Sequence, residues 1–171
     1  MKKHKWEKAW EDNKFSIKTL TPSVLVSQYE KLFERGDLIL DVGCGNGRNS
    51  IYLASKGYKL DCFDVADLGW QEKIPLSTLK NINFKKSDIL EYNYKVSQYK
   101  AIIVTRVIQY LSLVELAFLF EKIKYGLKPH GFLLLSYTTK GGIFDRKEIG
   151  GSTYLYQIEE IKELLRKIFR N

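Results

Sequence analysis

Short apolar runs alternate with amphipathic stretches along this chain. The runs predict five strands, over residues 37–42, 59–64, 82–87, 99–105 and 131–138. Apolar positions three and four residues apart predict helices over residues 4–14, 22–34, 47–56, 113–127 and 156–169. This alternation predicts an α/β fold, doubly wound around a mostly parallel sheet with helices on both faces.

Local signals refine these elements. Thr21 and Ser112 stand where N-caps of two helices are expected. Residues 67–80 are short for a crossover helix and contain Gly69 and Pro75, so we expect irregular structure there. A turn is expected over Lys128-Pro129-His130-Gly131, and a glycine-rich loop over residues 139–152.

Length and composition favour one compact domain. The chain has 171 residues, of which 44% are hydrophobic, enough for a core without disulfides or metals. We divide this domain, residues 1–171, into an N-terminal helical segment that could act as a lid, a central core, and a loop with a terminal helix: 1–34, 35–138 and 139–171.

Cysteine content and hydropathy indicate a cytoplasmic protein. Cys44 and Cys62 offer no disulfide framework. The sequence has neither a signal peptide nor an apolar run near the length that spans a bilayer, so no membrane partner is expected.

The formal net charge of +8 makes nucleic acid a candidate partner. The basic residues are nevertheless spread along the chain, with small clusters at its two ends, and no zinc-finger spacing, RNA-binding aromatic signature or basic helix accompanies them. A lysine-rich solvated surface is therefore favoured over a nucleic-acid site. Such a surface would attract anionic substrates weakly.

The run from Asp41 to Ser50 carries the strongest chemical signal. It follows an apolar segment and leads into another, which predicts a strand, a glycine-rich turn and a helix. Gly43, Gly45 and Gly47 let the backbone turn tightly and approach a ligand closely, at the positive end of a helix dipole. The turn is therefore a candidate site for a nucleotide-like cofactor.

The details of this turn favour S-adenosylmethionine over a dinucleotide. A dinucleotide fingerprint needs its third glycine at the position of Arg48, and this chain has Gly-x-Gly-x-Gly instead. The carboxylate of Asp41 would repel a pyrophosphate, but it could receive the cationic amino group of S-adenosylmethionine directly or through water.

Two later strands also end in acidic residues. Asp64 ends the second predicted strand, where a carboxylate can accept hydrogen bonds from both ribose hydroxyls. Asp88 follows the third strand and could meet the adenine amine, with Ile89 packed on the ring. Each has a plainer alternative, because Asp64 could be a solvated loop residue and Ser87-Asp88 a turn or cap pair.

On these residues the chain resembles class I S-adenosylmethionine-dependent methyltransferases. The stretch Asp41 to Ala54, the three acidic positions and the strand after Gly131 carry the resemblance, and the narrower stretch 47–50 is similar to the small tellurite-resistance-type methyltransferases. The resemblance implies a Rossmann-like fold, S-adenosylmethionine as cofactor and S-adenosylhomocysteine as product. The cofactor-binding positions that it implies are Asp41, Gly43, Cys44, Gly45, Asn46, Gly47, Asp64, Val65, Asp88, Ile89 and Thr105.

The resembling fold normally continues with an antiparallel hairpin at the sheet edge, which this sequence lacks. We therefore expect the fifth strand to be an exposed edge, which the last helix or a second chain could cover. A dimer through that edge is one expectation, and a shortened, partner-dependent chain is another.

The acceptor site is less well defined by the sequence. The end of the fourth strand usually faces the methyl acceptor in this architecture, and Arg106 and Tyr110 stand there; Arg48 and Tyr137 could face the same cleft. These four are the candidate substrate-binding residues. Further candidates are the lid residues Trp6, Trp10 and Tyr29 and the loop residues Arg146 and Tyr154.

No catalytic base or metal site is apparent. His4 and His130 stand in a tail and a turn, and the sulfonium already activates the methyl group, so alignment and proximity could suffice. The favoured function is methyl transfer to a small soluble acceptor, namely a thiol, a chalcogen oxyanion or an amine. The alternatives are a non-catalytic cofactor-binding subunit and an RNA or protein methyltransferase.

Overall fold

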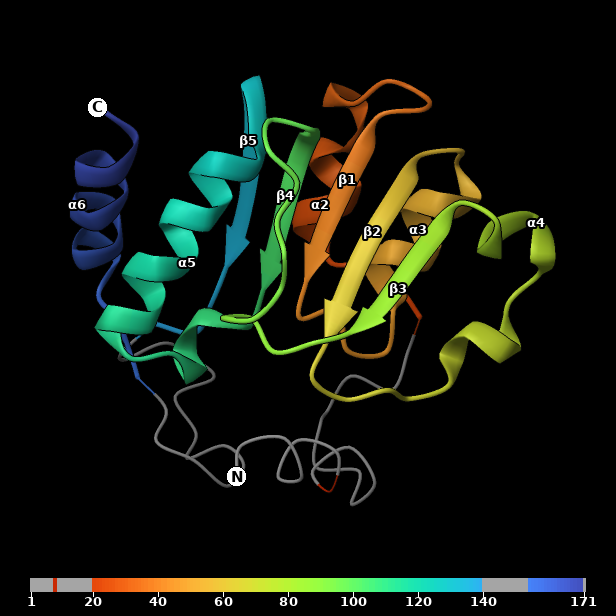
Figure 1. The fold of residues 1–171 in the computed structure, drawn as a ribbon, viewed down its shortest axis with the longest axis horizontal. Helices are drawn as coiled ribbons and strands as arrows, with labels where there is room; N and C mark the ends of the chain where they lie inside the picture. The colour runs from red at the N-terminus through yellow and green to blue at the C-terminus, as the bar shows by residue number, and fades with distance from the viewer. Residues whose placement is uncertain (1–7, 9–19, 140–153, 171) are drawn as a thin grey trace.

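The computed structural model describes residues 8, 20–139 and 154–170. The helix expected over 4–14, most of the loop over 139–152, and Trp6, Trp10 and Arg146 lie outside the described residues. Figure 1 shows the described elements, in chain order, as α2 (Val24–Tyr29), η1 (Glu30–Leu32), β1 (Leu38–Val42), α3 (Arg48–Ser55), β2 (Lys59–Asp64), η2 (Trp70–Lys73), α4 (Leu76–Leu79), β3 (Ile82–Lys86), β4 (Tyr99–Thr105), η3 (Ile108–Tyr110), α5 (Leu113–Gly126), β5 (Leu127–Ser136) and α6 (Ile158–Phe169).

The five strands form one parallel sheet in the order β3-β2-β1-β4-β5. Because all five run in the same direction, their carboxyl ends meet at one edge, at the bottom of Figure 1. The strand order reverses between β1 and β4, and ligands of open α/β sheets bind beyond the strand ends at such a point. The turn after β1 therefore lies where a cofactor is expected.

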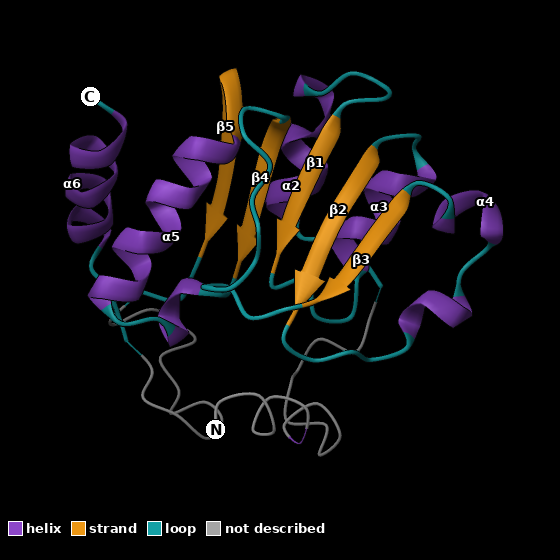
Figure 2. Cartoon of the chain, in the orientation of Figure 1, coloured by secondary structure: helices purple, strands orange, loops and turns teal. Residues whose placement is uncertain are grey.

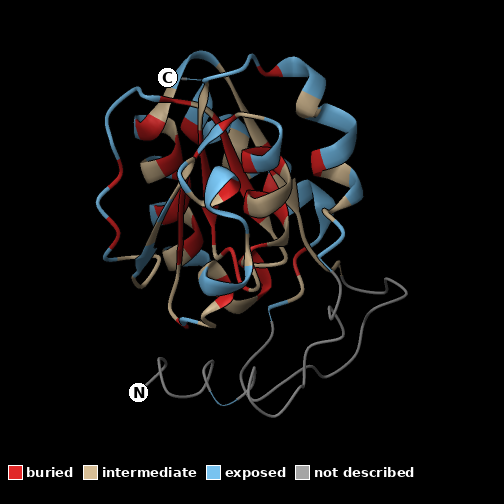
Figure 3. Ribbon diagram, turned by 90° about the vertical axis from the view of Figure 1, so that its right-hand side faces the viewer, coloured by how far each residue is buried: buried red, intermediate tan, exposed pale blue. Residues whose placement is uncertain are grey.

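Alternate residues of the central strands pack on opposite faces of this sheet. Leu40 and Ile102 belong to the core beneath α5 and α6, whereas their neighbours Ile39 and Ile103 pack toward α2 and α3. Figure 2 shows the helices on both faces, and Figure 3 shows the buried residues concentrated along the sheet between them. The predicted doubly wound fold is confirmed.

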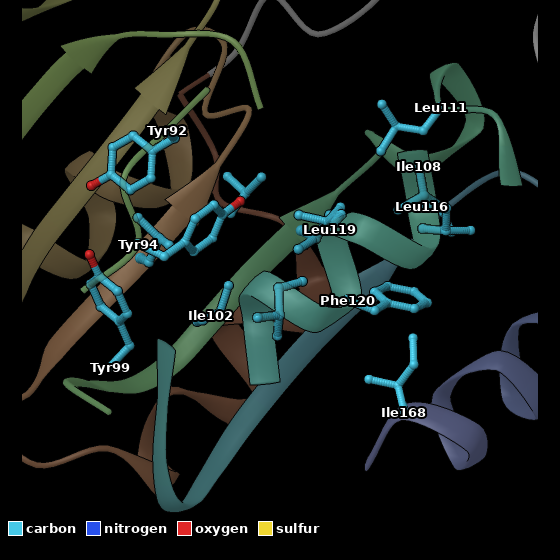
Figure 4. Packing of buried hydrophobic residues seen from close by; sticks show 14 of the residues in the cluster. Tyr92, Tyr94, Tyr99, Ile102, Ile108, Leu111, Leu116, Leu119, Phe120 and Ile168 are labelled. Atoms are coloured by element: carbon cyan, nitrogen blue, oxygen red, sulfur yellow. The ribbon is translucent and has the colours of Figure 1, made fainter. Parts of the chain in front are cut away.

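Helix α5 closes the larger core. A capping box fixes its start, because the Ser112 side chain accepts from the Glu115 N–H while the Glu115 side chain accepts from the Ser112 N–H. The Ser112 cap was predicted. Leu119 and Phe120 point from α5 into the core, with Ile168 of α6 beside them (Figure 4).

A polar cluster crosses the sheet within this core. The buried Asp61 carboxylate accepts from the Tyr99 hydroxyl at 3.0 Å, from Asn83 Nδ2 at 2.9 Å and from Lys95 Nζ at 2.7 Å. These bonds join β2, β3, β4 and the loop before β4. No local pattern predicts this cluster, because its members are distant along the chain.

Three local predictions differ from the structure. Ser23 rather than Thr21 caps α2, and that helix ends at Tyr29, followed by the short η1. The turn expected over 128–131 lies inside β5 as an irregularity in its pairing with β4, with His130 at φ 59°. Residues 67–80, expected to be irregular, contain the two short helices η2 and α4.

Candidate cofactor and acceptor site

The turn between β1 and α3 is built on glycine. Gly43, Gly45 and Gly47 have φ values of 65°, 54° and 74°, a region that other residues rarely adopt. A Cβ on Gly43 would lie 2.7 Å from Val107 Cγ2, and one on Gly47 would lie 2.6 Å from the Trp70 ring. Both conformation and close packing therefore require glycine at the two ends of the turn.

A backbone hydrogen bond to β2 and one within the turn hold the glycine turn in place. The Cys44 N–H donates to the Phe63 carbonyl of β2 at 3.0 Å, and the Gly47 N–H donates to the Cys44 carbonyl at 3.0 Å. Cys44, Cys62 and Trp70 form a small buried cluster beneath it. Both cysteines are buried free thiols in this structure.

Asp41 is buried directly before the turn, at 1% exposure. Its Oδ2 accepts from the Ser50 hydroxyl at 2.7 Å, while its buried Oδ1 has no hydrogen-bond partner among the described residues. Burial, reinforced by the nearby Asp64 and opposed by the Ser50 bond, raises the pKa of Asp41 to about 7. An unsatisfied buried carboxylate oxygen is costly, so it favours a cationic or hydrogen-bonding ligand.

Asp64 links the end of β2 to the glycine turn. Its Oδ2 accepts from the Gly45 N–H at 2.8 Å and its Oδ1 from the Ala66 N–H at 2.9 Å. Burial raises the pKa of this carboxyl, and the backbone N–H donors oppose that shift. Asp64 is thus a structural tie, and each oxygen keeps a second lone pair that could accept from a ribose hydroxyl.

Asp88 lies at the corresponding end of β3. Its Oδ1 accepts from the Leu90 N–H at 2.9 Å, which is the turn pair that the sequence allowed as an alternative. Ile89 is half-buried against the main core, and Val65 is half-buried after Asp64. An adenine contact for Asp88 and Ile89 stays a prediction.

Two hydrogen bonds of Asn49, which the sequence analysis did not predict, span the site. The buried Asn49 donates through Nδ2 to Thr105 Oγ1 at 3.2 Å and accepts at Oδ1 from the Ser23 N–H at 2.9 Å. It joins the start of α2, the first turn of α3 and the end of β4. A polar residue just after the glycines was the available signal, but its partners are too distant along the chain to be inferred.

The hydrogen bond between Asn49 and Thr105 brings two of the predicted acceptor-binding residues near each other. Arg48 precedes Asn49 and Arg106 follows Thr105, and both are half-buried. Burial lowers the pKa of the Arg48 guanidinium, Asp41 opposes that shift and Arg106 adds to it. Arg106 has φ 59°, a strained conformation, and its N–H donates to the Ser136 carbonyl at 2.7 Å.

The remaining candidates lie around this edge. Tyr110 is half-buried at the end of η3, and Tyr137 packs against the main core on the side of Glu159 and Glu160, where burial raises its pKa. The Tyr154 N–H donates to the carbonyl of the buried Gln109 at 2.7 Å. Tyr29 is 45% exposed.

Within residues 8, 20–139 and 154–170, no cluster of three or more His, Cys, Asp or Glu side chains could hold a metal ion. None of the helices described is long and apolar enough to cross a bilayer.

The strand order and the glycine turn with its buried acid are the features that the resemblance to class I S-adenosylmethionine-dependent methyltransferases predicts. The structure of a TehB-like S-adenosylmethionine-dependent methyltransferase from Corynebacterium glutamicum matches 98% of this chain and 82% of its own, at 14% identity and TM-score 0.66. Residues 6–141 match the model of the family described as tellurite resistance protein TehB, and the chain belongs to that family.

Two other relatives resemble the chain. Burkholderia thailandensis 1,6-didemethyltoxoflavin-N1-methyltransferase has a TM-score of 0.79 at 14% identity, over 97% of this chain and 75% of its own. The ribosomal protein L11 methyltransferase of Campylobacter concisus is 34% identical over 110 residues, 63% of this chain. The chain spans 37% of the length of that curated relative.

The residues present fit S-adenosylmethionine. The three-glycine turn gives a ligand close access to backbone, Asp41 offers an unsatisfied buried oxygen, and Asp64 stands at the adjacent strand end. Arg48 stands at the position where a dinucleotide-binding fingerprint has its third glycine, so this turn does not match a pyrophosphate site.

Proposed function

We propose that this chain transfers a methyl group from S-adenosylmethionine to a small soluble acceptor. The observation that carries the proposal is the buried Oδ1 of Asp41, which has no hydrogen-bond partner among the described residues and lies next to a turn of three positive-φ glycines. A pyrophosphate would be repelled there, whereas an ammonium group would be stabilised.

The cofactor roles follow from position. Asp41 receives the amino group directly or through water, the turn from Gly43 to Gly47 contacts the amino-acid part, and Asp64 accepts from the ribose. Asp88 and Ile89 hold the adenine, with Val65 and Thr105 completing the site. The bound cofactor supplies an electrophilic methyl group, so the chain's own task is to align the acceptor and exclude water.

The acceptor is a thiol, a chalcogen oxyanion or an amine, and the paired arginines favour an anionic one. Arg48 and Arg106 flank the Asn49–Thr105 bond at the edge where the methyl group would emerge. Two guanidinium groups at one site favour an acceptor with negative charge. The family description, tellurite resistance protein, agrees with a chalcogen oxyanion or its reduced products.

A methyl-transfer assay tests the activity. The chain is incubated with S-adenosylmethionine and, in turn, a thiol, an amine, tellurite and tellurite with excess thiol, and formation of S-adenosylhomocysteine is followed. We expect product with at least one of these acceptors. Cofactor binding without product from any acceptor would instead support a non-catalytic subunit.

A protein or RNA acceptor is the second candidate. The Campylobacter concisus relative is described as acting on ribosomal protein L11, and this chain carries a net charge of +8. Salt-sensitive retention on RNA, or methylation of ribosomal protein in an extract, would support it. The absence of retention on RNA at low salt would exclude RNA as the acceptor.

Binding of the cofactor should depend on pH through Asp41. Because the pKa of Asp41 is about 7 in the free protein, this carboxyl is largely protonated at pH 6 and largely ionised at pH 8. Binding an ammonium group requires the ionised form, so we expect weaker binding and proton release below pH 7. Calorimetry in buffers of different ionisation enthalpy measures the protons released.

Asp41→Asn is the control for this pH dependence. It should bind more weakly than the parent and lose the dependence between pH 6 and pH 8. Identical proton release in this variant and the parent would assign the titration to another group. The raised pKa also means that the free protein loses stability as pH rises from about 4 toward 7.

Arg106→Gly should affect the acceptor and leave the cofactor largely unaffected. Glycine adopts the positive φ of this position without strain, so the backbone can keep its conformation when the guanidinium side chain is removed. We expect the acceptor KM to rise by about tenfold to a hundredfold, the effect of one charged hydrogen bond, with the Kd for S-adenosylmethionine nearly unchanged. An unchanged acceptor KM would exclude Arg106 from the acceptor site.

A further inference from the structure

Asn49 lies at the junction of three elements beside the proposed acceptor site. It belongs to the first turn of α3, directly after Arg48, and it is 3% exposed. Its Oδ1 accepts from the N–H of Ser23, the N-cap of α2, at 2.9 Å. Its Nδ2 donates to Thr105 Oγ1, at the end of β4, at 3.2 Å. One buried amide therefore connects α2, α3 and β4.

The direction of these two hydrogen bonds is fixed. A backbone N–H can only donate, so the Ser23 N–H must face the carbonyl oxygen of the Asn49 amide. The amide nitrogen then faces Thr105, whose hydroxyl oxygen must accept. The hydroxyl hydrogen of Thr105 is therefore directed away from Asn49, and it has no acceptor among the described residues. This hydroxyl can donate to a ligand at the carboxyl edge of the sheet.

Two cations flank the Asn49–Thr105 bond. Arg48 precedes Asn49 and Arg106 follows Thr105 along the chain, and both arginines are half-buried. Burial lowers the pKa of the Arg48 guanidinium; Asp41 opposes this shift, and the charge of Arg106 adds to it. The two guanidinium groups therefore repel each other, and an anion bound by both would relieve the repulsion.

The backbone at Arg106 is held from both sides. Its φ of 59° persists in a residue other than glycine only where neighbouring contacts enforce it. The Arg106 N–H donates to the Ser136 carbonyl of β5, and the residue before it, Thr105, is bonded to Asn49. The place from which the Arg106 side chain starts is therefore set in part by Asn49.

We propose that Asn49 is a positioning residue for the acceptor site. Through its two bonds it directs the Thr105 hydroxyl outward and keeps the start of α3 against the end of β4. This hydroxyl and the guanidinium groups of Arg48 and Arg106 then act together as donors to one oxyanion. The inference rests on the proposed acceptor site and names an anionic oxygen compound as the acceptor class. An uncharged or cationic acceptor would leave the repulsion between the two arginines in place.

Oxyanion binding tests this role without relying on turnover. The full chain, saturated with S-adenosylhomocysteine, is titrated with tellurite and with selenite by calorimetry, and Asn49→Leu is compared with the parent. Leucine is similar in size to asparagine, but it can bond to neither Ser23 nor Thr105. We expect the Kd of at least one oxyanion to rise about tenfold or more in Asn49→Leu, while the Kd for S-adenosylhomocysteine changes less than about twofold.

A matched pair of variants at Ser23 tests the same link from outside the site, and it keeps the test decisive if Asn49→Leu does not fold. Ser23 has φ −63°, which proline can adopt, so Ser23→Pro removes the N–H that orients the Asn49 amide. Ser23→Ala keeps this N–H, and both variants lose the hydroxyl that caps α2. We expect Ser23→Pro to bind the oxyanion about threefold to tenfold more weakly than Ser23→Ala.

A purely structural role for Asn49 predicts a different result. It would weaken S-adenosylhomocysteine and oxyanion binding together, so parallel losses in Asn49→Leu would overturn the proposal. Equal oxyanion affinity in the two Ser23 variants, or no oxyanion binding by the parent at millimolar concentration, would also overturn it. Oxyanion binding that depends on Asn49, in a chain that transfers no methyl group, would support this inference and contradict only the proposed methyl transfer.

Discussion

Replacing Gly47 by alanine should abolish measurable binding of S-adenosylmethionine and lower the free energy of unfolding by about 2–5 kcal/mol. The added Cβ would lie 2.6 Å from two atoms of the Trp70 ring, on a residue with φ +74°. Trp70 is buried against Phe84 and the two cysteines, so its ring has little room to retreat. The turn must therefore shift, and we expect the proposed cofactor contacts to shift with it. Chemical denaturation and calorimetric titration measure the two effects.

Gly69→Ala is the matched control for Gly47→Ala. Gly69 also has a positive φ, +59°, but a Cβ there would meet nothing within 4 Å. We expect a cost of about 1–2 kcal/mol from the backbone alone and nearly unchanged cofactor affinity. If both variants bound S-adenosylmethionine like the parent, the turn would not be the cofactor site.

Replacing Asp64 by alanine should weaken cofactor binding by about 1.5–3 kcal/mol, or roughly tenfold to a hundredfold in Kd. The change removes the acceptor proposed for the ribose hydroxyls. It also breaks the 2.8 Å bond to the Gly45 N–H, so the turn loses its tie to β2. Titration with S-adenosylhomocysteine measures the loss without turnover.

Asp67→Ala controls for Asp64→Ala within the same connection. Asp67 is exposed, and its Oδ1 accepts from the Gly69 N–H at 3.0 Å rather than from a backbone group of the glycine turn. Its removal should leave Kd unchanged. Equal affinity of Asp64→Ala and the parent would refute a cofactor role for Asp64.

Much of the fold follows from local pattern. The strands at 59–64 and 99–105 coincide with β2 and β4, because buried parallel strands read as short apolar runs between polar residues. The Ser112 cap is also local, since the hydroxyl and its partner lie three residues apart. Interactions of this range can be recognised in a single sequence.

The errors come from tertiary contacts. Ser23 rather than Thr21 starts α2, and Asn49, distant in sequence, accepts its N–H at 2.9 Å. At the start of β5, His130 has a positive φ and the strand continues through an irregular pairing, which the Pro-His-Gly sequence made indistinguishable from a turn.

In the candidate site, too, some features follow from local sequence and others depend on tertiary structure. The positions of Asp41, Asp64 and the glycines follow from the strand-turn-helix pattern, and the structure places them around one turn. The unpartnered oxygen of Asp41, the Asn49–Thr105 bond and the strained Arg106 depend on the sheet order, which brings β1 next to β4. Their roles in binding stay predictions.

Calorimetric titration of the purified chain with S-adenosylmethionine, S-adenosylhomocysteine and NAD tests the central claim most directly. The claim requires micromolar binding of the first two, with one site per chain, and no binding of NAD. Binding of NAD, or of none of the three, would contradict it.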